Sequence, residues 1–273
     1  MTTTSSRTPE PPAVSRPLLP PPFPAVVLQL IRQMQQPMVT AGEVARLIEL
    51  DPSLTAALLR LVNSPFFGMR REIGNVSDAV MVMGMSAVRR QVLSLAVAAP
   101  LRRSEIDVGF ARQQWHAYVS CAALARHLVP GDAQVADLAF TSGLLHDIGQ
   151  VHLLQAHGDV YVQMHKDATS NDDLLDMETE QFGEAHDTLG GNLLEAWGLP
   201  KALSDAARHH HRKLPLTELS MVEKAVWIAN LVEKTPEQAA EGMLHFPGMF
   251  NPLPEAIEEA RIEIESLSSL MND

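Results

Sequence analysis

Hydrophobic residues recur at helical spacing along most of this chain, and no segment shows a strand pattern longer than a few residues. The first apolar stripe consists of Val26, Val27, Leu30, Ile31 and Met34. Further helix starts follow, with expected N-terminal caps at Thr40, Asp51, Ser77 and Ser86. The helix that begins at Ser86 is expected to end at Ala98. The pattern predicts a first lobe of short helices over residues 25–104.

Longer helices are expected in the second half of the chain. They are Phe110–Val129, a helix capped by Asp132 that ends at His146-Asp147, Val151–Ala156, Val160–Ala168, Asp172–Phe182, Ala185–Trp197, Pro200–His210, Leu219–Val232 and Pro254–Leu270. The glutamates of the last helix, Glu263 among them, are interpreted as a solvated face. The predicted organisation is all-α: a disordered Pro-rich tail (1–24), a first lobe (25–104), a second helical lobe (105–235) and a C-terminal helical extension (236–273).

Composition supports a helical protein of the reducing cytoplasm. Hydrophobic residues make up 46% of the chain but aromatic residues only 5%, so the core must be aliphatic. The single cysteine, Cys121, excludes an intrachain disulfide framework. No uninterrupted apolar run reaches the roughly 18 residues of a membrane span, and the N-terminus lacks the pattern of a signal peptide. A cytoplasmic location without membrane contact is therefore expected.

The charge is unevenly distributed. The formal net charge is −12, yet the segment 53–104 contains seven arginines and two acidic residues, which gives it a charge of +5 and leaves −17 elsewhere. Arg70, Arg71, Arg89 and Arg90 are candidate partner-binding residues on this basic lobe. A solvated arginine-rich face is the equally simple alternative. The acidic remainder disfavours nucleic acid as a partner.

The segment 143–150 carries the candidate chemistry. His146 precedes Asp147 there, between an apolar helical run and Gly149. Adjacent side chains of a regular helix point about 100° apart, so the two are expected to share a metal ion only where the helix is interrupted. Gly149 is expected to end the helix. Imidazole nitrogen and carboxylate oxygen suit Zn, Fe or Mn. A buried hydrogen-bonded pair without a metal ion remains the alternative.

Histidines further along the chain fit the same site. His186 lies early in a predicted helix, and His209, His210 and His211 end the helix that follows Pro200. Because the C-terminal end of a helix favours cations, three consecutive histidines are also consistent with a charged cap. The remaining histidines are scattered and are expected to be structural or surface residues.

In their order, these motifs resemble the HD-related output domain (HDOD) family, the signalling branch of the His-Asp metal-dependent phosphohydrolase superfamily. The matching positions are Leu58–Gly68, Ile73, Val76–Ala79, Met83-Gly84, Gly143–Gly149, Glu180–Gly183, His186, Gly190, Leu193-Leu194, Trp197, Leu199-Pro200 and His210-His211. The resemblance implies an HD-like second lobe packed on a smaller first lobe. It also implies metal ligands at His146, Asp147, His186 and His210, with His211 a weaker candidate.

Three positions depart from the hydrolases of this superfamily. Their ligand histidine, two residues after the position of Trp115, is Ala117 here, their last aspartate is Asn230, and the lysine after the dyad glycine is Gln150. With Asp147 as the only clearly placed carboxylate, two divalent ions would leave uncompensated charge in a partly buried site. The resemblance and these departures together imply no required cofactor and room for one divalent ion, Fe, Mn or Zn, in a structural role.

The expected function is a non-catalytic signal-transduction output or adaptor module, working through signalling proteins or through a nucleotide or cyclic dinucleotide. The alternative is a metal-dependent phosphohydrolase acting on a nucleotide or cyclic dinucleotide. In that case Asp147 would bridge the metal ions, and His146, His186 and His210 would complete the ligand shell around an activated water. The sequence does not specify an oligomeric state.

Overall fold

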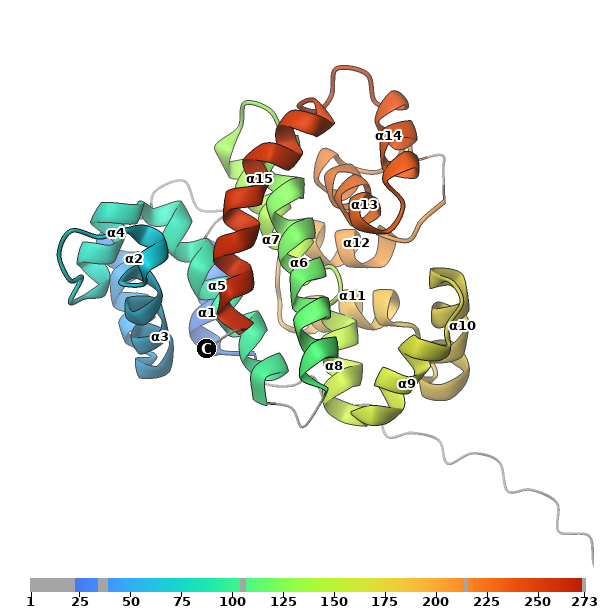
Figure 1. Ribbon diagram of the computed structural model, residues 1–273, viewed down its shortest axis with the longest axis horizontal. Helices are drawn as coiled ribbons and strands as arrows, with labels where there is room; N and C mark the ends of the chain where they lie inside the picture. The colour runs from blue at the N-terminus through green and yellow to red at the C-terminus, as the bar shows by residue number, and fades with distance from the viewer. Residues whose placement is uncertain (1–22, 34–38, 104–106, 214–215, 272–273) are drawn as a thin grey trace, which may run out of the picture.

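The structure, a computed structural model, describes residues 23–33, 39–103, 107–213 and 216–271. Every regular element in these ranges is helical (Figure 1), which confirms the all-α prediction. The predicted tail lies outside the described residues, apart from Phe23 and Pro24.

Five α-helices form the smaller group at the left of Figure 1. They are α1 (Ala25–Gln33), α2 (Ala41–Glu49), α3 (Pro52–Val62), α4 (Val76–Met83) and α5 (Met85–Arg103), with the short helix η1 (Pro65–Phe67) between α3 and α4. The capping box predicted at Thr40 is present, and Asp51 accepts hydrogen bonds from the first amides of α3. Asn63 stabilises the loop after α3, since its side chain both accepts a hydrogen bond from the backbone of Ile73 and donates one to it.

The remaining helices form the larger group. They are α6 (Val108–Leu128), α7 (Ala133–Leu145), α8 (Ile148–His157), α9 (Asp159–Asp167), α10 (Asn171–Phe182), α11 (His186–Ala196), α12 (Lys201–His209), α13 (Met221–Lys234), α14 (Pro236–Leu244), α15 (Leu253–Ser268) and η2 (Ser269–Met271). In Figure 1, α15 runs alongside α6 down the middle of the molecule. One continuous hydrophobic cluster extends from α1 to α12, so both groups of helices share a core.

Several expectations about the helices differ from the structure. The cap of α4 is Asn75 rather than Ser77, because the Asn75 side chain accepts the Asp78 amide hydrogen bond at 2.7 Å. The helix expected to end at Ala98 continues as α5 to Arg103, through Pro100, with Leu101 buried in the core. A proline inside a helix is unfavourable on its own, so burial of the apolar residues around Pro100 outweighs the signal that would end α5 there. Helix α14 was not predicted.

Partly buried ion pairs join α5 to the larger group. Arg90 on α5 lies 2.7 Å from an Asp137 oxygen on α7 and 2.9 Å from a Glu263 oxygen on α15. Arg126 on α6 also contacts Glu263, at 3.3 Å. The interpretation of Glu263 as part of a solvated face was therefore wrong, since its side chain is only 14% exposed. The Asp137 and Glu263 carboxylates pair with the Arg90 guanidinium, whereas Arg70 and Arg71 are exposed.

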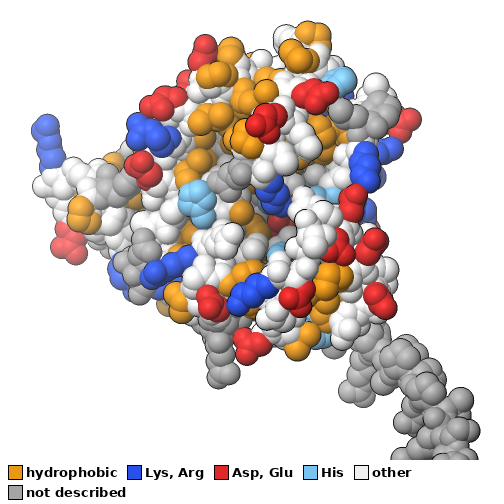
Figure 2. Space-filling view, turned by 45° about the vertical axis from the view of Figure 1, so that its right-hand side comes forward, with side chains coloured by type: hydrophobic (Ala, Val, Ile, Leu, Met, Phe, Trp, Pro, Cys, Tyr) orange, Lys and Arg blue, Asp and Glu red, His pale blue; other side chains and the backbone are white. Residues whose placement is uncertain are grey.

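Charged side chains of both signs are interspersed on the face shown in Figure 2. Arg89 is half-buried, and burial lowers the pKa of its guanidinium.

Among the described helices, none is by itself long and apolar enough to cross a membrane. Only α4 and α5 taken together meet that requirement of length and composition, and they are bent by 120° relative to each other.

The contact between α6 and α7 requires a glycine at position 143. A Cβ atom at this position would lie 2.8 Å from the Ala122 Cα. We expect Gly143→Ala to lower the free energy of unfolding by about 1–3 kcal/mol, as overpacking does, measured by urea unfolding. Gly42→Ala is the matched control, because a Cβ there meets nothing within 4 Å. An unchanged stability of Gly143→Ala would show that α6 and α7 can separate without cost.

Candidate metal centre

The break between α7 and α8 positions the dyad. Helix α7 ends at Leu145, His146 caps it, and Asp147 is the N-cap residue of α8. His146 Nε2 lies 3.1 Å from Asp147 Oδ2, and both side chains are almost completely buried. The predicted interruption of the helix at this dipeptide is therefore present.

Gly149 does not end a helix, as expected from the sequence, but lies in the first turn of α8. A Cβ atom at this position would lie 2.0 Å from the carbonyl oxygen of His186. The glycine is required because the backbones of α8 and α11 approach each other closely. This approach brings His186, the first residue of α11, next to Asp147.

Asp147 lies at the centre of the predicted histidines. Its Oδ1 atom is 3.3 Å from His186 Nε2 and 3.0 Å from His210 Nε2, while Oδ2 faces His146. His211 Nε2 lies 3.1 Å from His186 Nε2. One ligand atom each from Asp147, His186, His210 and His211 falls within 4.8 Å of all the others. The structure thus brings Asp147, His186 and His210 together with His211, whereas His146 lies beside Asp147 Oδ2 and is not part of this group.

The Nδ1 atoms of three of these histidines are held by acceptors. His146 Nδ1 lies 2.6 Å from the Gly143 carbonyl oxygen, and His210 Nδ1 lies 2.6 Å from that of Ala207. His186 Nδ1 lies 2.7 Å from Glu178 Oε2. Carbonyl and carboxylate oxygens only accept, so each Nδ1 must carry the hydrogen. The Nε2 atoms face Asp147, the orientation usual for metal-binding histidines.

This arrangement requires positive charge between the side chains. A neutral imidazole with hydrogen on Nδ1 presents a lone pair at Nε2, and Asp147 presents only oxygen lone pairs. Within the described residues, Asp147 Oδ1 and His210 Nε2 have no conventional hydrogen-bond partner. Protons or a metal ion must therefore balance these buried acceptors. The donor set of imidazole nitrogens and one carboxylate oxygen fits Zn, Fe or Mn.

In the metal-free protein the balance comes from protons. Burial favours neutral His186, but the nearby Asp147 carboxylate and the hydrogen bond to Glu178 outweigh it and raise the pKa of His186 to about 9. Asp147 also raises the pKa of His146 well above its usual value, against the effect of burial. For His210 burial prevails and lowers the pKa to about 4. The Asp147 carboxylate is thus neutralised mainly by His146 and His186.

Glu178 is a site residue that the sequence analysis missed. It is fully buried on α10, where its carboxylate accepts hydrogen bonds from the His186 backbone amide, the His186 ring and the Tyr161 hydroxyl. Glu178 lies four residues after Leu174 and four before Phe182, so it interrupts the apolar stripe of an otherwise acidic helix. A carboxylate at such a position was the available signal.

The positions that depart from the hydrolases add no ligand to the centre. Trp115 is buried and donates to the Leu267 carbonyl, while His116 is exposed and does not belong to the cluster. Asn230 donates to the His210 carbonyl oxygen at 3.5 Å. The Gln150 side-chain amide lies 3.3 Å from His186 Nε2. Of the described residues, only one group with the composition of a metal site was found.

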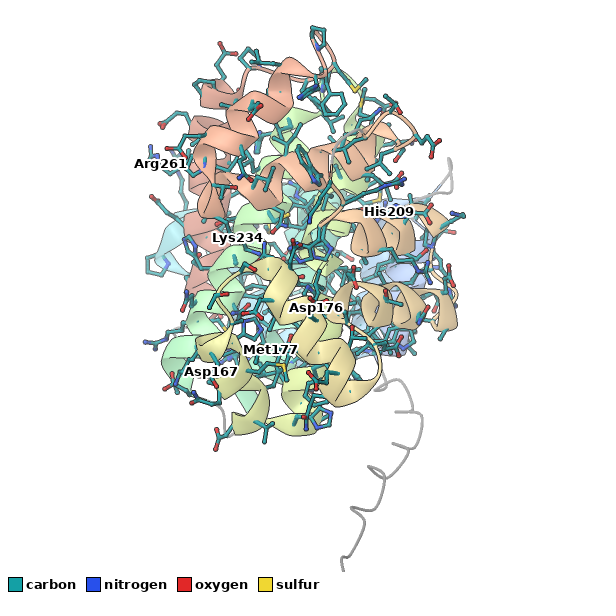
Figure 3. All side chains as sticks on the ribbon, turned by 90° about the vertical axis from the view of Figure 1, so that its right-hand side faces the viewer. Asp167, Asp176, Met177, His209, Lys234 and Arg261 are labelled. Carbon is teal, nitrogen blue, oxygen red and sulfur yellow. The ribbon has the colours of Figure 1, made fainter. Side chains whose placement is uncertain are left out.

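A cavity leads from the surface to one side of the cluster. It has a volume of about 510 Å³ and is lined in part by His210, His211, Arg212, Lys213 and Asn230. Figure 3 shows α10, with Asp176 and Met177, on the side of the molecule that faces the viewer, and Lys234 on α13 above it. Lys213 pairs with Asp172 at the cavity wall, at 2.8 Å. The His211 side of the centre is therefore open, whereas His146 and His186 are enclosed.

With this geometry established, comparisons with known proteins assign the family. The HDOD domain model matches residues 20–213. The chain belongs to the HDOD family. It is also 27% identical, over 194 residues, to an uncharacterized protein of Treponema pallidum (strain Nichols), covering 70% of this chain but only 37% of that protein.

Solved structures show the same fold as this HDOD protein. A protein of Shewanella amazonensis SB2B, described as a candidate phosphohydrolase, matches with a TM-score of 0.68 and 21% identity over 93% of this chain and 95% of its own. A candidate signal transduction protein of Marinobacter aquaeolei VT8 matches with a TM-score of 0.69 and 20% identity, over 93% of this chain and 60% of its own. At these identities the likeness concerns the fold alone.

The contact between Glu178 and His186 generates a prediction. Glu178→Gln removes the charge that holds the Nδ1 hydrogen of His186, so we expect metal affinity to fall by about 10- to 100-fold. The measurement is a titration with Zn²⁺ against a competing chelator. Glu180→Gln, on the exposed side of the same helix, is the matched control and should bind as the wild type does. Equal affinities for the two variants would mean that Glu178 does not orient a ligand.

Proposed function

We propose that this HDOD protein is a non-catalytic signal-transduction module that holds one divalent ion in its second lobe. The observation that carries the proposal is the donor set around Asp147, a single carboxylate facing four imidazole nitrogens. One divalent ion would neutralise that carboxylate and fix the imidazoles around it. Asp147, His186, His210 and His211 would hold this ion, with His146 as the further nitrogen beside Asp147 Oδ2.

Charge argues against a second ion and hence against two-metal hydrolysis. Two divalent ions would bring a charge of +4, while Asp147 is the only carboxylate in the cluster. Glu178 is already engaged by His186 and Tyr161, and the last hydrolase aspartate is replaced by Asn230. Excess charge of this size in a buried site is strongly unfavourable. We therefore infer that the protein acts through contacts with signalling partners rather than through turnover.

A metal-dependent phosphohydrolase is the second candidate, and one specific observation favours it. The cavity of about 510 Å³ opens onto His210 and His211, and Arg212 and Lys213 line its wall together with Asp172 and Glu241. Because Lys213 pairs with Asp172, a phosphate-bearing nucleotide or cyclic dinucleotide would meet the Arg212 guanidinium as the main cationic group there. In such an enzyme the metal ion supplies Lewis acidity and an activated water.

Metal content tests the first proposal. We expect about one ion per chain by ICP-MS after purification, and loss of this ion in Asp147→Ala and in His210→Ala, since each removes a central ligand. His245→Ala, at an exposed histidine remote from the cluster, should retain it. Two ions per chain, together with phosphodiester hydrolysis that Asp147→Ala abolishes, would establish the hydrolase instead. A metal-free wild type that resists loading with Zn²⁺, Mn²⁺ or Fe²⁺ would contradict metal binding altogether.

The protonated state of the free centre predicts how metal binding depends on pH. His186, with a pKa of about 9, is charged in the metal-free protein at neutral pH, and a metal ion must displace its proton. Metal affinity should therefore rise as the pH increases towards 9, by about tenfold per pH unit for each proton released. Calorimetric titration of Zn²⁺ in buffers of different ionisation enthalpy measures the released protons. Binding without proton release would contradict the assignment of protons to His146 and His186.

A further inference from the structure

A groove on the first lobe lies between α3 and α5, far along the chain from the histidine cluster. Its volume is about 640 Å³. Leu54 and Leu95 form its buried apolar part, each about 7% exposed, and alanine residues line much of the rest. Small side chains between two adjacent helices leave room for a third helix to lie against them.

The charge of the groove comes from two arginines. Arg60 on α3 and Arg102 on α5 both line it, and both are exposed. Within the described residues neither forms an ion pair or a hydrogen bond, in contrast to Arg90 farther back on α5. None of the described residues that line the groove is acidic. Asp51, which precedes the lining residue Pro52, accepts hydrogen bonds from the Ser53 and Leu54 amides.

From these observations we propose that the groove between α3 and α5 binds an acidic amphipathic helix of a signalling partner. The apolar face of such a helix would cover Leu54, Leu95 and the alanines, and its carboxylates would pair with Arg60 and Arg102. Charge complementarity selects an acidic partner, and the small alanine side chains between α3 and α5 leave room for a helix to pack there. The proposal names a partner for the regulatory role proposed above, but it does not depend on the metal centre.

Arg60 and Arg102 thus extend the set of candidate partner-binding arginines. The sequence had singled out Arg70, Arg71, Arg89 and Arg90 from the same basic segment. Arg90 is held by Asp137 and Glu263. Arg60 and Arg102 combine exposure with an apolar surface beside them, and an interface needs both properties to gain affinity and orientation.

The test uses the full chain and a designed probe. The probe is a fluorescein-labelled 18-residue helical peptide with leucines on one face and glutamates beside them, and its scrambled counterpart has the same composition without an apolar face. Fluorescence anisotropy should show saturable binding of the first peptide only, weakening as salt is added. The double variant Arg60→Glu/Arg102→Glu should weaken binding at least tenfold, because two attractions become repulsions. Arg46→Glu, at an exposed arginine on α2 outside the groove, should have little effect.

A further variant separates docking in the groove from attraction to positive charge in general. Ala56→Arg adds bulk to the exposed wall of the groove and also adds a positive charge. A helix seated in the groove should lose affinity for this variant, whereas a peptide attracted only by charge should gain it. Circular dichroism and the melting temperature verify that each variant is folded.

Several outcomes would overturn the proposal. They are unchanged or stronger binding to Ala56→Arg, an equal loss in Arg46→Glu, and no binding of the amphipathic peptide to the wild type. Binding of a cyclic dinucleotide in its place, lost in the Arg60/Arg102 double variant, would identify a small anion as the occupant and reject the helix. Metal content measured on the same variants should stay at the wild-type value, so failure of the docking proposal and failure of the metal proposal can be distinguished.

Discussion

The second lobe depends on one buried negative charge. Asp147 is almost completely enclosed, and an isolated carboxylate in such surroundings would be strongly unfavourable. Imidazole nitrogens from three separate regions of the chain converge on it. The Nδ1 atom of each of these rings contacts a carbonyl or carboxylate oxygen on its other side. The positions of α8, α11 and α12 relative to α7 follow from this requirement, because each must deliver its group to the same few ångströms.

Several features of the fold and of the site could be predicted from local sequence signals. The capping box at Thr40, the Asp51-Pro52 start and the Asp132 cap are short-range features, and the structure contains all three. The dyad at a helix break was also predictable, since two adjacent side chains cannot otherwise share a site. The order of the family motifs then indicated that His186 and His210 would join them.

Other parts of the structure depend on contacts that local patterns do not encode. Gly149 was expected to end a helix, but its role is set by the His186 backbone, 37 residues away along the chain. Glu178 was not singled out and Glu263 was interpreted as part of a solvated face, yet Glu178 is buried and Glu263 is only 14% exposed, because their partners belong to other elements. Periodicity shows which face of a helix is apolar, but it does not show which carboxylate on that face will meet a histidine or an arginine.

The proton-bearing histidines have a consequence for how the protein would respond to metal supply. His146 and His186 can balance Asp147 as cations, and a divalent ion can balance it when they are neutral. Protons and the proposed metal ion would thus be interchangeable counterions for the same core carboxylate, so the helices around it would not need to come apart when the ion leaves. Such a centre would be suited to reversible exchange: its occupancy would follow the free metal concentration and the local acidity while the scaffold persists.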